Sequence, residues 1–204
     1  MTEHINWAEA YRKKHKQKNF IEKDWNKAAA TFHERAVRDD YKECLFSKLE
    51  LSKEDTVLDL GCGEGTLSLE LANKVKHVTG LDSAEKMLEL FEEKAEKQNI
   101  TNVDTILKPI EEINYKDIGD YDIVIASRSL NTIQPIENVL KEMDKIANKA
   151  VYFTYFGPDN WKIVREFYKY INKEYIEFPG YNYIFNILYN LGIYPNTERL
   201  YKTI

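Results

Sequence analysis

The segment from Val57 to Leu71 constrains the fold of this chain more than any other part of the sequence. A short apolar run, 56–60, predicts a buried parallel strand. It is followed by glycines at alternate positions and then, from Leu67, by a helical pattern; the glycines are Gly61, Gly63 and Gly65. Strand, glycine turn and helix in this order let the backbone approach a nucleotide-like ligand closely.

A carboxylate is placed where such a ligand needs one. A second short strand is predicted at 77–81, and it leads to Asp82, seventeen residues after Gly65. An acidic residue about 20 positions beyond the glycine turn usually holds the hydroxyls of a ribose. Asp82 also suits the N-cap of a helix that begins at Ala84, so both roles remain open at this point.

The glycine spacing limits the choice of ligand. In the dinucleotide pattern G-x-G-x-x-G, counted from Gly61, the third glycine position is held by Thr66, and the extra glycine is one residue earlier. Asp59 precedes the turn, where its charge would repel a pyrophosphate. A ligand with an ammonium or sulfonium group fits better, which makes a nicotinamide-dependent oxidoreductase the weaker alternative.

An acidic residue, one spacer and G-x-G-x-G form the first motif of the class I S-adenosylmethionine-dependent methyltransferases, which this chain resembles over residues 24–156. The resemblance implies a doubly wound, mostly parallel α/β sheet with helices on both faces. It also implies S-adenosyl-L-methionine as the cofactor and methyl transfer to a small molecule by in-line displacement. A non-catalytic cofactor-binding subunit that supports a partner protein is the alternative.

The resemblance also assigns roles to positions of this chain. The glycine backbone would line the methionine part of the cofactor, Asp59 would support the loop or meet the amino group, and Asp82 would bind the ribose. Many relatives carry an acidic residue near position 108; here it is Lys108, so backbone or Glu111 would replace that contact. The implied cofactor-binding residues are Asp59, Gly61, Cys62, Gly63, Gly65, Asp82, Ser83, Lys108, Pro109, Ile110 and Ser127.

The loop 126–131 would face the methyl acceptor. It lacks the Pro-Pro motif of methyltransferases that act on exocyclic amines of bases or on glutamine, which disfavours those substrates. Arg128 would bind a carboxylate or phosphate of the acceptor, bind the cofactor carboxylate, or pair with a surface acid. Trp25 is either a lid residue or a core anchor, and Asn131 completes the candidates. No catalytic residue is assigned, because thiols, amines and phenolates can arrive deprotonated.

Composition excludes several classes of partner. The net charge is −5, which argues against nucleic acid, although the basic stretch 12–18 is either a solvated helix face or a contact for an anionic surface. No apolar run reaches the roughly 20 residues that span a bilayer, and no hydrophobic signal core is present, so we expect a cytoplasmic protein with no membrane partner. Two cysteines and four histidines show no disulfide framework or metal spacing, and Cys62 is expected to be a spacer rather than a catalytic thiol.

We predict two parts: an N-terminal helical extension or lid, 1–50, in which residues 5–50 are helical throughout with Asp24 as a cap, and a cofactor-binding domain, 51–204. The domain is predicted to have strands at 56–60, 77–81, 103–107, 121–126 and 150–156, and helices at 65–74, 84–98 and 135–147.

The tail is predicted to form helices 159–175 and 181–191, with Gly192 at a helix end, and one last strand, 197–204. The sheet of this family normally ends in two strands, so the edge is expected to be incomplete. A second copy in a homodimer, the tyrosine-rich tail or further chain after Ile204 would cover it. The tyrosines of this tail would line an acceptor pocket, pack internally or form a dimer face: Tyr168, Tyr170, Tyr175, Tyr181, Tyr183, Tyr189 and Tyr194.

Overall fold

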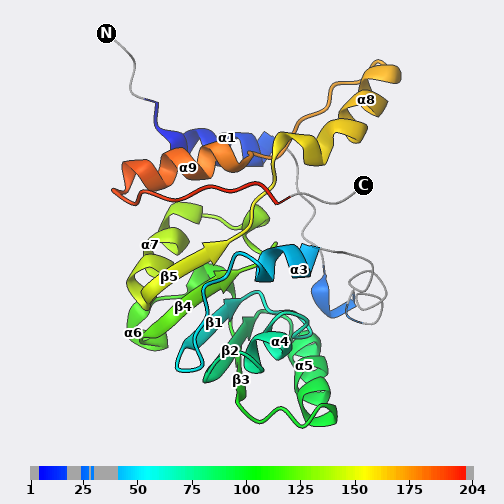
Figure 1. Ribbon diagram of the computed structural model, residues 1–204. Helices are drawn as coiled ribbons and strands as arrows, with labels where there is room; N and C mark the ends of the chain where they lie inside the picture. The colour runs from blue at the N-terminus through cyan, green and yellow to red at the C-terminus, as the bar shows by residue number, and fades with distance from the viewer. Residues whose placement is uncertain (1–4, 18–23, 28, 30–40, 201–204) are drawn as a thin grey trace.

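A five-stranded parallel sheet forms the centre of the protein (Figure 1). The computed structural model describes residues 5–17, 24–27, 29 and 41–200. The strand order is β3-β2-β1-β4-β5, and every neighbouring pair is parallel. This confirms the predicted α/β fold. The strands are β1 Thr56–Leu60, β2 His77–Asp82, β3 Val103–Leu107, β4 Tyr121–Ala126 and β5 Ala147–Phe153.

Helices cover both faces of this sheet, as the alternating pattern predicts. One face packs mainly on α7 and the other on α4 and on α3, Tyr41–Phe46. Helix α7 shows the cause most clearly, since its apolar residues recur three and four apart and all face the core. The helices of the sheet domain are α4 Ser68–Ala72, α5 Glu85–Lys97, α6 Tyr115–Ile118 and α7 Ile136–Ile146, with short 3-10 turns η1 Ile110–Glu112 and η2 Leu130–Thr132.

The fifth strand starts three residues earlier than predicted and ends three earlier. Helix α7 ends at Ile146 and β5 begins at the next residue, because Ala147 already pairs with Tyr121 across an irregular register. The ladder stops at Phe153. The Thr154 amide still donates to the Ala126 carbonyl (3.1 Å), but the chain then leaves the sheet.

A second layer lies beyond the carboxyl ends of β4 and β5 (Figure 1). It consists of α1, Trp7–Gln17, and α9, Tyr181–Asn190, which lie side by side. The rings of Trp7 and Tyr183 meet edge to face with centroids 5.6 Å apart. Ile184, Ile187 and Leu188 bury the other side of α9 against the core that α7 also joins. Two helices far apart in sequence therefore together cover this end of the sheet.

The prediction that residues 5–50 are helical throughout is wrong in part. Helix α3 spans only Tyr41–Phe46, and residues 47–50 form a turn and coil. Residues 25–27 and 29 are helical, and the Asp24 carboxylate accepts a hydrogen bond from the Lys27 amide (3.1 Å), which confirms the predicted cap. The positions Phe32, Ala36 and Val37, on which the periodicity also relied, lie outside the described residues.

The predicted helix 159–175 is shorter in the structure. A 3-10 turn, η3 Pro158–Trp161, leads into α8, Lys162–Tyr170. The helix stops because Asn172 takes a φ of 51°, and the Lys173 amide then bonds to the Tyr168 carbonyl (2.9 Å).

The predicted last strand is also corrected. Residues 197–200 are not a strand, and 201–204 lie outside the described part of the chain. After α9 the chain instead runs back toward α3 (Figure 1), where Glu198 pairs with Lys48 (2.6 Å). Leu200 packs on the apolar cluster that includes Phe46 and Tyr152. Side-chain contacts thus hold this segment, and no strand follows β5 within residues 154–200.

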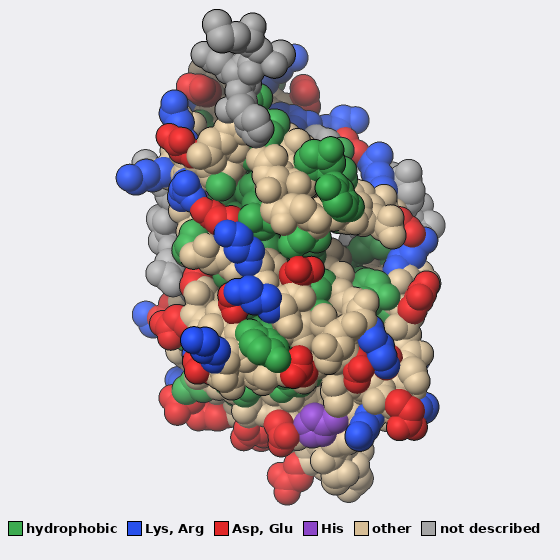
Figure 2. All heavy atoms as spheres, turned by 90° about the vertical axis from the view of Figure 1, so that its left-hand side faces the viewer, with side chains coloured by type: hydrophobic (Ala, Val, Ile, Leu, Met, Phe, Trp, Pro, Cys, Tyr) green, Lys and Arg blue, Asp and Glu red, His purple; other side chains and the backbone are tan. Residues whose placement is uncertain are grey.

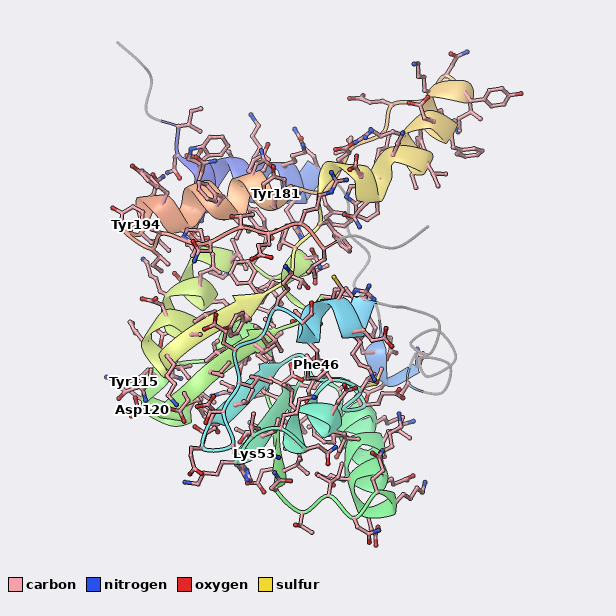
Figure 3. The ribbon with its side chains drawn as sticks, in the orientation of Figure 1. Phe46, Lys53, Tyr115, Asp120, Tyr181 and Tyr194 are labelled. Atoms are coloured by element: carbon pink, nitrogen blue, oxygen red, sulfur yellow. The ribbon has the colours of Figure 1, made fainter. Side chains whose placement is uncertain are left out.

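The tyrosines of the tail mostly contact other aromatic rings. Tyr168 packs on Tyr175 (centroids 5.0 Å apart) and Tyr189 on Tyr194 (5.4 Å), while Tyr183 meets Trp7. Tyr181 and Tyr194 stay partly exposed and lie at opposite ends of the α9 segment (Figure 3).

No helix among the described residues combines the length and apolarity needed to cross a bilayer. Within the same residues, no cluster of three or more His, Cys, Asp or Glu side chains is arranged to hold a metal ion. Acidic and basic side chains alternate over the face shown in Figure 2.

Candidate functional site

The glycine turn leads from β1 to α4 and hydrogen-bonds to the neighbouring strand β2 at the carboxyl edge of the sheet. The amides of Gly61 and Cys62 both donate to the Leu81 carbonyl, at 2.7 and 3.1 Å. All three glycines of the turn have positive φ, between 56° and 78°, which L side chains rarely adopt. The turn is therefore held in one backbone shape by its own sequence and by the neighbouring strand.

The three glycines are required for different reasons. A Cβ at Gly61 would stand 2.5 Å from the Ser129 Cβ, and one at Gly65 would stand 2.6 Å from the Phe91 ring. At Gly63, by contrast, a Cβ would meet no atom of the described residues within 4 Å. Packing explains two of the glycines, whereas the Cβ position of Gly63 meets open space among the described residues.

Asp82 lies beside this open space and ties the turn to the next helix. One carboxylate oxygen accepts from the Gly63 amide and the other from the Ala84 amide, each at 2.9 Å. Since each oxygen has two lone pairs, the carboxylate keeps acceptor capacity for the hydroxyls of a ribose. Both predicted roles are compatible with this arrangement, because Asp82 anchors backbone and still presents free acceptor positions.

Asp59 is buried beneath the turn. It accepts a hydrogen bond from the Ser68 hydroxyl (2.5 Å), which joins β1 to the first residue of α4. Burial raises the pKa of Asp59 to about 6, against the lowering effect of the Ser68 bond, and the nearby Asp82 charge adds to the rise. The buried position of Asp59 is consistent with its predicted role of supporting the glycine loop.

Cys62 is a packing residue in this structure. Its side chain is buried, and burial raises the pKa of its thiol well above the usual value, with further contributions from Asp59 and Asp82. A protonated, enclosed thiol is a poor nucleophile. Its Sγ instead lies 2.8 Å from the place a Cβ would occupy at Gly80, so Cys62 together with Phe91 requires a glycine in β2.

The residues after β3 approach the same edge. The Lys108 amide donates to the Asp82 carbonyl (2.9 Å), and its ammonium pairs with Asp117 (3.0 Å). Pro109 precedes η1, and buried Ile110 reaches within 3.2 Å of the Cβ position of Gly61. Backbone at 108–110 therefore flanks the turn, while the Lys108 head group is directed to Asp117.

The loop after β4 forms a polar cluster that the sequence indicates only in part. Tyr41, on α3, bonds through its hydroxyl to the Ser127 hydroxyl (2.8 Å) and the Thr154 hydroxyl (2.7 Å). The Arg128 guanidinium stacks over the Tyr41 ring, 3.6 Å from its centroid, and the Arg128 amide donates to the Thr154 hydroxyl (2.9 Å). Ser127 and Arg128 were predicted site residues.

Tyr41 and Thr154 are additions that sequence reasoning missed. Thr154 follows the end of β5, a position that the parallel sheet would have suggested. Tyr41 carries no comparable sequence signal, because its place depends on how α3 packs. Ser129 is also new: its hydroxyl donates to the Leu60 carbonyl (2.6 Å) and so joins this loop to the glycine turn.

Asn131 is buried on η2, and its side-chain oxygen has no hydrogen-bond partner among the described residues. The buried imidazole of His15, from α1, hydrogen-bonds to the Asn131 backbone. Burial lowers the pKa of His15, so this ring is neutral at pH 7. His15 also adjoins the rings of Tyr11 and Phe178, at 5.9 and 5.7 Å.

The basic stretch 12–18 makes contacts with the layers on either side of α1. Arg12 pairs with Glu137 on α7, Lys14 lies 5.5 Å from the centre of the Tyr183 ring, and His15 is buried. The described part of this stretch therefore serves mainly to attach α1 to the layers beside it.

Trp25 lies apart from the core. It is 42% exposed, so the core-anchor interpretation is wrong. Its helical turn docks on the start of α5, where the Asn26 side chain accepts from the Lys86 amide (3.1 Å) and Ala29 packs on Ala84 and Met87. This places the turn next to Asp82 and Ser83, the region that a lid would cover.

The arrangement was compared with known proteins. Residues 51–177 match the methyltransferase domain family. A Haemophilus influenzae protein of uncharacterized function is 29% identical over 174 residues, which is 84% of this chain and 64% of that protein. The (S)-tetrahydroprotoberberine N-methyltransferase of Eschscholzia californica is 33% identical over 107 residues, 52% of this chain and 29% of that enzyme. The chain thus spans less than two thirds of the length of these relatives.

A solved structure shares the fold over most of the chain. It is a methyltransferase of Haloferax volcanii in complex with the Trm112 activator, with a TM-score of 0.67 and 16% sequence identity. The alignment covers 86% of this chain and 78% of that one.

Proposed function

Because this chain belongs to the methyltransferase domain family, as a class I S-adenosylmethionine-dependent methyltransferase, we propose that it transfers a methyl group to a small-molecule acceptor by in-line displacement. The family cofactor is S-adenosyl-L-methionine, whose sulfonium supplies the activated methyl group. We also propose a cytoplasmic location and a non-nucleic-acid acceptor, in keeping with the net charge of −5.

One observation carries the proposal: open space at Gly63 directly beside the Asp82 carboxylate. Bare backbone would contact the methionine part of the cofactor, and Asp82 would accept from the ribose hydroxyls. Ser83 and the backbone at 108–110 would flank the adenine. Asp59 supports the loop through Ser68, and Gly61 and Gly65 serve the packing that holds the loop in shape.

The acceptor would lie on the other side of the turn, near the loop after β4. Methyl transfer needs a nucleophile held near the methyl carbon and protected from water, more than it needs acid or base chemistry. The hydroxyls of Tyr41, Ser127 and Thr154, and the Asn131 side-chain oxygen, which no described residue bonds, supply donors and acceptors for orientation. Arg128 and Trp25 remain candidates for contact with the acceptor and for its cover.

Two tyrosines of this region, buried Tyr11 and half-buried Tyr155, are unsuited to take a proton there. Tyr11 and Tyr155 share a hydrogen bond (3.0 Å), and burial raises the pKa of Tyr11 to about 12 and that of Tyr155 still further. Neutral His15, by contrast, is able to accept a proton from an acceptor that arrives protonated. It is the titratable side chain that we propose for this role.

Titration calorimetry with S-adenosylhomocysteine tests the cofactor site. We expect binding of S-adenosylhomocysteine and none of NAD. In Asp82→Ala the Kd should rise by roughly tenfold or more, since each unpaired buried polar group costs about 1–3 kcal/mol. Gly63→Val should abolish binding and keep the circular dichroism spectrum.

Asp104→Ala is the matched control, because Asp104 is an exposed carboxylate on the neighbouring strand β3 that pairs with His77. Equal Kd values for the wild type and Asp82→Ala would refute the assignment. Methyl transfer from labelled S-adenosylmethionine into fractionated metabolites would then separate an enzyme from a non-catalytic subunit, for which no fraction accepts label.

A further inference from the structure

Helix α8 stands away from the rest of the protein (Figure 1). It follows η3 directly and ends at Tyr170. Its contacts run mainly to the returning chain: the rings of Tyr168 and Tyr175 are 5.0 Å apart, and Arg165 pairs with Glu177. None of its nine residues is buried, whereas α7 buries five of its eleven. Side chains radiate from α8 into the surroundings (Figure 3).

The outward face of α8 is apolar. Ile163 is 85% exposed, Phe167 57% and Tyr170 85%, and Ile171 continues the face beyond the helix end. At 3.6 residues per turn the first three fall within about 60° of the helix circumference. Helices of globular proteins turn such a stripe toward the core, and here it points outward. No described residue packs on it as a core cluster.

Positive charge accompanies this apolar face. Residues 162–173 contain four basic side chains and one acidic one, a net charge of +3 in a chain whose total is −5. Lys162, Lys169 and Lys173 are all exposed. Lys162 and Lys169 lie on one side of the apolar stripe, as helical geometry requires. An amphipathic helix with aromatic and aliphatic residues on one face and lysines beside it is typical of binding to a membrane surface.

We propose that α8 is an interfacial helix that docks this protein on an anionic lipid surface. Ile163, Phe167 and Tyr170 would enter the headgroup boundary, and the three lysines would contact the lipid phosphates. A second copy of the chain fits less well, because a symmetric contact through α8 would bring the lysines of both copies together. This proposal departs from the sequence-based expectation of no membrane partner, which rested on the lack of an apolar run long enough to span a bilayer and of a hydrophobic signal core.

The test is co-sedimentation of the full chain with vesicles of phosphatidylcholine, with or without phosphatidylglycerol. We expect binding only to the anionic vesicles, and weaker binding as salt increases. Phe167→Glu should abolish it. Lys169→Gln should lower the partition coefficient about fivefold, the effect of one lysine near a charged bilayer.

Two matched controls lie far from α8. Leu107→Glu changes a residue with the same 57% exposure, on β3, and Lys116→Gln removes an exposed lysine on α6. Both should bind vesicles like the wild type. Equal losses in control and α8 variants, or no binding by the wild type at low salt, would overturn the proposal. So would light scattering that shows a dimer lost in Phe167→Glu, since the face would then belong to a second copy.

Discussion

The β1–β3 half of the molecule and the tail from η3 onward are held in place by different kinds of interaction. In the first, backbone hydrogen bonds and buried glycines fix almost every position, from the Leu81 carbonyl that receives two amides to the Phe91 ring that excludes a side chain at Gly65. In the second, aromatic residues are partly exposed, and contacts to distant segments such as α1 decide the path. The region proposed to bind the cofactor therefore has a closely fixed backbone, whereas the region proposed to bind lipid presents exposed side chains.

The sharpest test of the β1–β3 half compares two glycines of the turn that differ in the space around an added Cβ, Gly65 and Gly63. Gly65→Ala is expected to lower the free energy of unfolding by about 2–5 kcal/mol. A positive φ costs about 1–2 kcal/mol, and overpacking against Phe91 adds about 1–3 kcal/mol. Gly63→Ala has the same backbone cost but no steric clash, so it should lose only about 1–2 kcal/mol. Urea unfolding measures both; equal losses would show that Phe91 adjusts freely.

The difference between these two regions also explains which features the sequence predicts correctly. The strand 56–60 and the carboxylate Asp82 follow from local patterns, since apolar runs, glycines and spacing act within about thirty residues of each other. Their positions in the structure match those patterns. Tyr41 and Thr154 meet only because α3 packs across the ends of β4 and β5, and no local pattern records that contact.

The tail was mispredicted for a related reason. The residues from Thr197 have β-forming character, and β5 is an edge strand of the sheet, but the ion pair of Glu198 with Lys48 and the packing of Leu200 hold this segment in another path. Likewise, the helical pattern after Asp159 continues past Tyr170, while the positive φ of Asn172 ends the helix. Tertiary contacts decided both outcomes.

A pH experiment probes the buried carboxylate under the turn. The folded-state pKa of Asp59 is about 6, above its ordinary 3.8, so the folded state holds this proton more tightly than the unfolded chain. Stability from this group is therefore full at low pH and is lost as pH rises from about 4 to about 6, on the order of 3 kcal/mol. Asp59→Asn should remove that part of the pH dependence. The difference between the unfolding curves of the two proteins isolates it, and parallel curves would exclude a raised pKa.

The polar cluster after β4 is tested by a smaller change. Tyr41→Phe deletes the hydroxyl that bonds to Ser127 and Thr154, and we expect a loss of about 1–2 kcal/mol in the free energy of unfolding. Tyr115→Phe is the matched control. Its hydroxyl bonds to Asp120 on the surface (Figure 3), so its removal should change little. Equal effects of the two variants would mean that water replaces the bonds of Tyr41.

The smallest effect is expected at Lys108, where the resemblance and the geometry diverge. The ammonium of Lys108 pairs with Asp117, and such a partly exposed ion pair contributes about 0–1 kcal/mol. The stem is more enclosed, with the side chain only 23% exposed, so Lys108→Ala should lose more through packing than through charge. Lys108→Met keeps the stem and should recover most of the loss in unfolding free energy. If the backbone at 108–110 flanks the adenine, both variants should bind S-adenosylhomocysteine within roughly twofold of the wild type, a difference of about 0.4 kcal/mol. A large loss of affinity in Lys108→Met, despite intact stability, would instead place the ammonium at the cofactor, and Lys108 would then pair with Asp117 only when the cofactor is not bound.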